Sequence, residues 1–267
     1  MKDRIKNYGF VIPEILPEDF VLGGSKLPTT VLRNDGQWPE LLVPHEQQNL
    51  FAVETTNCIG FASSTIWEIL IKYQYNDERN FSDRALGIMA GTRPPGNTPN
   101  KVAYTAHKWG LVPEALLPFS DTITNASEYF SPDPLPQPIL DAATYFLTQY
   151  ELGYEWVFVG GSMQEKHERM MEALRYGALG LAVAAWHEEE GMYIQDMMAN
   201  HWCVAIGYVK NQYWLIKDSY PPFIKKIPWN SDFAFSMRYS ATRKIISSSL
   251  TKKWRCFLGN YFKELMK

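Results

Sequence analysis

Cys58 stands where a loop is expected to turn into a helix, and this position can make a cysteine reactive. The apolar residues after it recur at steps of three and four, which predicts one buried helix face formed by Ala62, Ile66, Ile69, Leu70 and Tyr73. The preceding Thr55-Thr56-Asn57 are of types that cap helix starts. A thiol in the first turn lies at the positive end of the helix dipole, which favours the thiolate. Cys58 is therefore a candidate nucleophile; the alternative is a small buried hydrophobic residue.

A histidine and a carboxylate lie at the ends of two neighbouring predicted strands. His201 opens the apolar run at 202–208, and Asp218 follows the run at 213–216, with a turn between the two runs. In an antiparallel pair the start of one strand lies beside the end of the next, so these two side chains are expected to be adjacent. A cysteine, a base and a group that orients the base form the constellation of covalent acyl transfer.

The elements that position these residues divide the chain into a helical half and a β-rich half, which predicts an α+β fold. The expected helices cover 58–73, 82–89, 101–109, 139–150 and 164–176, and the expected strands cover 156–159, 179–185, 202–208 and 213–216. Residues 1–41 are predicted to form an extended arm, 42–125 the helical half, 126–230 the β-rich half and 231–267 a basic C-terminal extension.

Composition excludes several classes of function. A net charge of −3 over 267 residues gives no reason to expect nucleic acid or a membrane surface as partner. No phosphate-binding glycine pattern occurs, His187 among three glutamates is typical of a solvated loop, and the three cysteines lack the spacing of a zinc site, so no cofactor or metal is predicted. The sequence has no signal peptide or transmembrane segment, which predicts a soluble cytoplasmic or virion-associated protein.

Six short motifs, in the same order along the chain, resemble those of the papain-like cysteine peptidases. Cys58 with Phe61-Ala62-Ser63 resembles the family's Cys-Trp-Ala-Phe-Ser helix, and Asn200-His201 resembles its Asn-His strand. The run Trp214-Leu215-Ile216-Lys217-Asp218-Ser219-Tyr220 is similar to its Trp-Ile-Val-Lys-Asn-Ser-Trp strand. Three further segments also resemble segments of this family. They are Phe81-Ser82-Asp83-Arg84, Leu117-Pro118-Phe119, and Gly96-Asn97, which corresponds to the family's glycine-rich substrate-binding loop. The resemblance covers about residues 42–230, and a narrower likeness points to phage and bacterial members.

The resemblance implies a helical subdomain, an antiparallel barrel-like subdomain and an active-site cleft between them. It assigns Cys58 as nucleophile, His201 as base and Asp218 as the group that orients His201. The family's oxyanion glutamine lies six residues before the nucleophile, where this chain has Ala52, so Gln48 is the candidate and Asn57 a weaker one. Asp218 replaces an asparagine, and Thr55 and Asn97 replace a pair of disulfide cysteines, which is consistent with a reducing compartment.

The leading prediction is a cysteine peptidase that cleaves peptide or protein substrates through a Cys-His-Asp triad and an acyl-enzyme. One alternative is a catalytically silent papain-like component of a phage or prophage particle, with a phage or host protein as partner. The other is a Cys-His-Asp acyltransferase of transglutaminase type, because the same three groups can transfer an acyl group to an amine.

Overall fold

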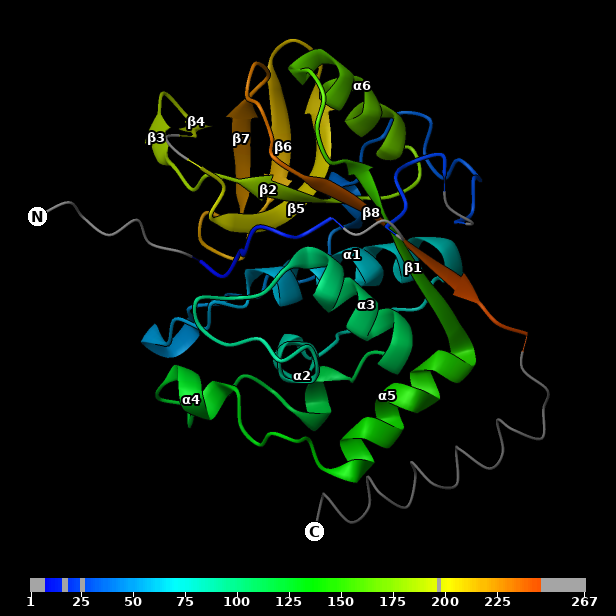
Figure 1. Cartoon of the computed structure of the whole chain (residues 1–267), viewed down its shortest axis with the longest axis vertical. Coiled ribbons are helices and arrows are strands. Elements are labelled where there is room, and N and C mark those ends of the chain that lie inside the picture. Colours follow the sequence, from blue (N-terminus) through cyan, green and yellow to red (C-terminus); the bar gives the residue numbers. More distant parts are fainter. Residues whose placement is uncertain (1–7, 16–18, 25–26, 196–197, 246–267) are drawn as a thin grey trace, which may run out of the picture.

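Helix α1 (Cys58–Tyr75) forms the centre of the molecule, and its start at Cys58 confirms the predicted helix. The computed structural model describes residues 8–15, 19–24, 27–195 and 198–245. In Figure 1 the helical half lies below α1 and the sheet above it. The helix packs on β5 and β8 on one side and on α2 and α3 on the other, so nearly all of it is buried rather than only one face.

The helical half is made of short helices whose ends follow local sequence signals. Ser82 caps the second helix, because its Oγ accepts a hydrogen bond from the backbone N–H of Ala85 at 3.0 Å. Gly110 ends the third helix with φ 91°, a conformation that favours glycine. The elements of this half are η1 (Pro39–Leu41), η2 (Leu50–Ala52), α2 (Asp83–Met89), α3 (Pro99–Trp109), η3 (Glu114–Leu116), α4 (Ala126–Tyr129) and α5 (Gln137–Gln149). Helices α4 and α5 lie beyond residue 125, where the helical half was predicted to end, and Figure 1 shows them with the other helices.

The other half is built on a six-stranded antiparallel sheet of order β1-β8-β2-β5-β6-β7. Its strands are β1 (Tyr150–Phe158), β2 (Leu179–Val183), β5 (His201–Val209), β6 (Tyr213–Lys217), β7 (Ile224–Pro228) and β8 (Ser236–Arg243). Helix α6 (Met163–Ala173) lies beside this sheet, and β3 (His187–Glu189) and β4 (Met192–Ile194) form a separate hairpin (Figure 1). Strands β1 and β7 are the two edges and do not pair in the described part of the chain, so the expected barrel is an open sheet.

The boundary predicted at residue 230 is wrong, because it separates β8 from the sheet that contains it. Strand β8 pairs with both β1 and β2. Its basic residues Arg238 and Arg243 suggested a solvated tail, but Met237, Tyr239 and Ala241 occupy every second position of the strand and are buried. Arg238 is itself buried and forms an ion pair of 3.2 Å with Glu155. The rest of the predicted basic extension, 246–267, lies outside the described residues.

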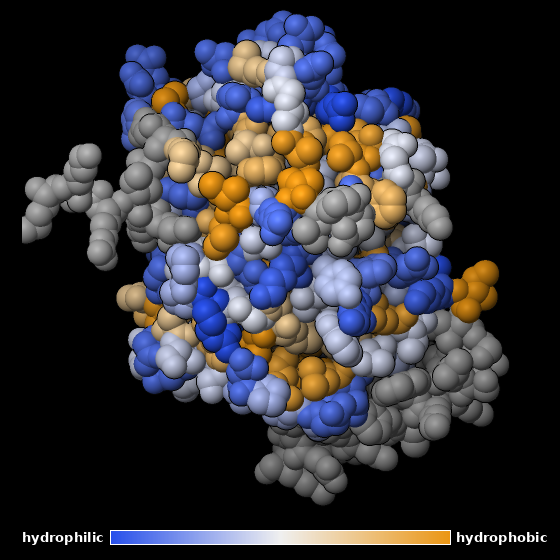
Figure 2. Space-filling view, in the orientation of Figure 1, coloured by the Kyte–Doolittle hydropathy of each residue, from blue (hydrophilic) through white to orange (hydrophobic). Residues whose placement is uncertain are grey.

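Figure 2 shows apolar side chains in small groups separated by polar ones on the face in view. Among the helices in the described ranges, none is both long and apolar enough to cross a bilayer.

Candidate active site

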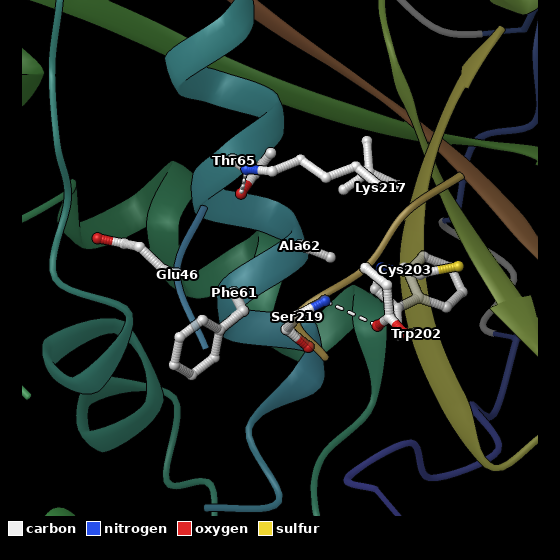
Figure 3. Close-up of a pocket in the computed structure, with 10 residues that line it drawn as sticks. Glu46, Phe61, Ala62, Thr65, Trp202, Cys203, Lys217 and Ser219 are labelled. Atoms are coloured by element: carbon white, nitrogen blue, oxygen red, sulfur yellow. Dashed lines mark hydrogen bonds between the residues drawn. The ribbon is translucent and has the colours of Figure 1, made fainter. Parts of the chain in front are cut away.

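Strands β5 and β6 bring His201 and Asp218 together, as the antiparallel pairing predicts. Val204 pairs with Lys217, so the residue after β6, Asp218, falls opposite Cys203 and diagonal to His201, the first residue of β5. His201 Nε2 lies 2.6 Å from Asp218 Oδ1, and both side chains are buried. The same oxygen accepts the N–H of Ser219 at 2.7 Å (Figure 3). The other imidazole nitrogen, Nδ1, is buried and has no hydrogen-bond partner among the described residues.

Cys58 is the first residue of α1 and faces the start of β5. The backbone N–H of Trp202, which follows His201 in the chain, interacts with the Cys58 sulfur. Burial raises the pKa of Cys58, and the negative charges of Asp218 and Glu54 raise it further, whereas the N–H groups of Trp202 and Ile59 lower it. The net shift is upward, so the predicted lowering of this pKa is wrong for the thiol in its fully buried state.

Gln48 lies on the same side of the molecule as His201. Its Nε2 donates to the carbonyl oxygen of Tyr8 at 2.9 Å and to Glu54 Oε1 at 3.0 Å. The hydroxyl of Ser219 donates to Gln48 Oε1 at 2.8 Å. Because Ser219 directly follows Asp218, this hydrogen bond ties the amide of Gln48 to the loop that holds the carboxylate.

Asn57, the weaker candidate for an oxyanion donor, is engaged elsewhere. Its Nδ2 donates to the carbonyl oxygen of Asp83 at 2.8 Å and to the hydroxyl of Tyr129 at 3.0 Å. Both partners belong to the helical half, so the donor group of Asn57 is directed away from the strand that carries His201. Asn57 precedes α1 without a side-chain capping bond, although its type favours one.

Lys225 is a member of the site that sequence analysis did not identify. Its Nζ lies 2.7 Å from Asp218 Oδ2 and donates to the carbonyl oxygens of Tyr220 and Pro222, each at 2.6 Å. Burial raises the pKa of Asp218, but the charges and hydrogen bonds of His201 and Lys225 lower it more strongly, so that the net shift is downward. Asp218 is therefore held as a carboxylate between two partners.

A weak sequence signal for this lysine exists. In β7 the residues alternate between exposed and buried, with Lys225 and Ile227 buried and Lys226 exposed. Ile227 could have marked the inward face, but two adjacent lysines are typical of a solvated surface. No expected strand covered this segment.

Residues of the N-terminal arm lie across the site. The N–H of Tyr8 donates to the carbonyl oxygen of Asn200 at 3.1 Å, and the Tyr8 ring meets the His201 ring edge to face at 5.4 Å. The carbonyl oxygen of Tyr8 is the acceptor for Gln48. Figure 1 shows this part of the arm, in dark blue, running between the two halves. The candidate residues are therefore covered by the chain's own backbone.

The arm continues onto the loop that the resemblance assigns to substrate binding. The Phe10 ring stacks on Trp202 with 5.7 Å between ring centroids. The N–H of Asn97 donates to the carbonyl oxygen of Gly9 at 3.0 Å, and the N–H of Val11 donates to that of Asn97 at 2.8 Å, which makes a short parallel bridge. The arm thus binds by backbone pairing and one aromatic anchor, as an extended peptide would.

Two glycines allow this close approach. A Cβ atom on Gly9 would collide with the carbonyl oxygen of Thr56, and one on Gly96 would collide with Gly9. Both glycines have positive φ, 120° and 140°, which disfavours any other residue type. The arm can therefore lie against the residues before α1 only because side chains are absent at these two positions.

A pocket of about 320 Å³ remains open beside His201. Its lining includes Trp186, Tyr193, His201, Tyr220 and Lys225. Trp186, Tyr193 and Tyr220 are aromatic, and His201 and Lys225 add polar groups to the lining. This space can hold one side of an extended peptide.

Behind the site, a buried acidic cluster surrounds Lys217. The Lys217 side chain points toward Thr65 of α1, with its Nζ 3.3 Å from the Thr65 hydroxyl (Figure 3). Burial raises the pKa of Glu68 to about 8 and that of Glu114 to about 7, and it raises the pKa of Asp83 as well. Burial lowers the pKa of Lys217, against the opposing effect of Glu68. Within the described ranges no three acidic, histidine or cysteine side chains are arranged to hold a metal ion.

Comparisons with known proteins identify the fold. No protein-family model and no curated protein sequence matches this chain. Xylellain, a cysteine protease from Xylella fastidiosa, matches over 92% of this chain and 99% of its own, with a TM-score of 0.62 and 16% identity. Digestive procathepsin L 3 of Tenebrio molitor matches over 88% of this chain and 77% of its own, with a TM-score of 0.58 and 14% identity. Bromelain from Ananas comosus, in complex with the E64 inhibitor, matches over 76% of this chain and 97% of its own, with a TM-score of 0.54 and 15% identity.

The chain therefore has the papain-like fold, and this confirms the predicted α+β class. Its structural neighbours are papain-like cysteine proteases, which supports the resemblance drawn from the short motifs. Sequence identities of 14–16% show the fold and not the activity.

Proposed function

We propose that this protein is a cysteine peptidase in which Cys58 is the nucleophile, His201 the base and Asp218 the residue that orients His201. The observation that carries the proposal is the state of the imidazole. Asp218 accepts the hydrogen bond of Nε2 at 2.6 Å, which leaves the buried Nδ1 without a partner in the described part of the chain. An imidazole held at one nitrogen and free at the other is prepared to exchange a proton at the free one.

The proposed reaction has two halves, acylation of Cys58 and hydrolysis of the acyl-enzyme, and His201 transfers a proton in both. Cys58 Sγ attacks the carbonyl carbon of the scissile bond while His201 Nδ1 holds the thiol proton, and His201 then gives that proton to the leaving amine. Water, deprotonated by His201, attacks the thioester carbonyl carbon; the C–S bond breaks, the new carboxyl group is released and His201 returns the proton to Cys58 Sγ. Gln48 Nε2 donates a hydrogen bond to the oxyanion in both steps, which stabilises charge that develops only in the transition state.

The arm has to leave the site before a substrate can bind. Gln48 Nε2 donates to the carbonyl oxygen of Tyr8, so the proposed oxyanion donor is engaged by the chain itself. Cys58 and His201 are 0% and 1% exposed, respectively. Displacement of the arm would free the Gln48 donor and hydrate the thiol, and hydration removes the main cause of its raised pKa.

A peptide or protein substrate fits this arrangement. The arm lies in the site as an extended backbone that pairs with Asn97 and inserts Phe10 against Trp202. A substrate chain of the same extended form could make equivalent backbone hydrogen bonds. The pocket beside His201, of about 320 Å³, would then receive residues beyond the scissile bond.

The test is proteolysis in water enriched in ¹⁸O, with an unfolded protein as substrate and mass spectrometry of the products. Peptide hydrolysis predicts new carboxyl ends that carry ¹⁸O, and their loss in Cys58→Ala. Products joined to an added amine, without ¹⁸O, would instead indicate an acyltransferase of transglutaminase type. Absence of any Cys58-dependent product, also after removal of residues 1–11, would contradict the proposal and favour a structural role such as a phage-particle component.

A further inference from the structure

The ammonium group of Lys225 is fully coordinated inside the site. Its three N–H donors are matched by three acceptors: Asp218 Oδ2 at 2.7 Å and the carbonyl oxygens of Tyr220 and Pro222 at 2.6 Å each. The side chain is 2% exposed. Its Nζ also lies 5.5 Å from the ring centroid of Trp186 and 5.3 Å from that of Tyr193, at distances typical of cation–π contacts.

Strand β7 fixes which of two adjacent lysines enters the site. Lys225 pairs with Ile216 across β6 and β7, and the alternation of the strand directs its side chain inward. Lys226 is directed outward, where its Nζ lies 4.7 Å from the ring centroid of Tyr213. The two positions therefore share a strand and a residue type but differ in environment.

A carboxylate buried beside a histidine creates an electrostatic difficulty. Unpaired, it would favour the imidazolium and disfavour a thiolate nearby, and its own burial would be costly. The negative charge of Asp218 raises the pKa of Cys58. A cation on the second carboxylate oxygen cancels most of this charge without disturbing the first oxygen, which holds His201.

We propose that Lys225 is a positioning residue that neutralises Asp218 and holds its carboxylate in the orientation that His201 requires. This inference rests on the proposed function of the site. The aspartate and the lysine together act as a neutral acceptor for the imidazole N–H, so that aspartate can stand where the resembled family has asparagine. Other titratable groups surround the site and also affect its charge balance. They are Tyr8 of the arm, Glu54 and Cys58 around the start of α1, Tyr193 of β4, Cys203 of β5 and Tyr220.

The test is the pH profile of turnover in the arm-deleted protein, for the parent, Lys225→Met, Asp218→Asn and the double variant. Loss of the lysine leaves a net negative charge, which disfavours the thiolate and favours the imidazolium. Both limbs of the profile should therefore move to higher pH, by about one unit. Asp218→Asn leaves a net positive charge and should move both limbs to lower pH. The double variant removes both charges and should return the profile toward that of the parent.

Lys226→Met is the matched control and should leave the profile unchanged. If Lys225→Met does not fold, Asp218→Asn can be compared with the double variant. Only an electrostatic role of Lys225 predicts that the pH profile of the double variant returns toward that of the parent. Equal profiles for the parent and Lys225→Met would overturn the inference, as would a double variant that behaves like Asp218→Asn.

A second measurement separates failure of this inference from failure of the proposed peptidase. In Cys58→Ala protein, NMR can follow the titration of the His201 ring without any turnover. The inference predicts that Lys225→Met moves this titration to higher pH and that Lys226→Met does not. This result is expected whether or not Cys58 cleaves peptides. An unchanged titration would therefore contradict the proposed role of Lys225 but not the proposed peptidase.

Discussion

His201 Nε2 and Asp218 Oδ1 are 2.6 Å apart, and each side chain is 1% exposed. The same carboxylate oxygen accepts the N–H of Ser219 at 2.7 Å, so its direction is fixed by the backbone as well as by the imidazole. An amide oxygen at this place could accept the same two hydrogen bonds. Asparagine at this position therefore removes the charge of Asp218 and keeps these two hydrogen bonds, but its amide NH2 group replaces the oxygen that accepts from Lys225.

Asp218→Asn should keep turnover within about tenfold of the parent at its optimal pH, because the amide oxygen can still hold the ring. Asp218→Ala should lose about 100-fold, because the ring is then free to turn away from the sulfur. Turnover of the three proteins, each in the arm-deleted background, gives the comparison. Alanine and asparagine variants that both match the parent would show that another group orients His201.

Phe10→Ala should open the site. Phe10 is 2% exposed and stacked on Trp202, and loss of a buried phenylalanine side chain costs about 3 kcal/mol or more. If half of that energy holds the arm in place, the uncovered fraction rises about tenfold. The rate of Cys58 alkylation by iodoacetamide should rise accordingly. Ile12→Ala, in the same arm but 56% exposed, is the control; equal rates for the two variants would contradict a covering role.

Gln48→Ala should lower turnover about 100- to 1000-fold, the usual effect of removing one oxyanion donor. Gln48 is fully buried and bonded to Ser219, so this variant is also expected to lose some thermal stability. Turnover should therefore be measured well below its melting temperature. Gln47→Ala is the neighbouring control, since the Gln47 side chain donates only to Asn49 among the described contacts. A rate equal to that of the control would remove Gln48 from the proposed mechanism.

Folding stability should fall as pH rises from about 4.5 to 8, through the buried acids around Lys217. Burial raises the pKa of Glu68 to about 8 and of Glu114 to about 7, so the folded state binds protons that the unfolded state releases in this range. Asp218 has the opposite shift and contributes stability that is lost as pH falls. Thermal unfolding across pH should show a flatter decline for Glu68→Gln, which keeps the acceptor for the Phe81 N–H. An unchanged slope would contradict the raised pKa of Glu68.

The parts of the fold that were predictable from sequence are those with strong local signals. The spacing of apolar residues after Cys58 predicted α1, and the Ser82 cap and Gly110 marked the ends of two further helices. The adjacency of His201 and Asp218 followed from strand pairing alone. These features depend on residues close in sequence or on the period of a single element.

The parts that were missed depend on contacts between distant segments. Strand β8 was hidden by its charges, because Arg238 is buried against Glu155 of β1, far away in the sequence. Lys225 resembled a surface residue until its three acceptors were known. The cover formed by Tyr8 and Phe10 depends on pairing with Asn97 and stacking on Trp202, which no local pattern records. Tertiary context decided each of these cases.

The most direct test of the central claim is labelling of Cys58 by E64, the inhibitor bound in the matched bromelain structure. The Phe10→Ala protein should be incubated with E64 near neutral pH and its adducts located by peptide mass spectrometry. We expect an adduct on Cys58 and none on Cys256 or on the buried Cys203, which serves as an internal control. His201→Ala in the same background should abolish the adduct. Absence of an adduct on Cys58, or equal labelling without His201, would contradict a catalytic thiol at this site.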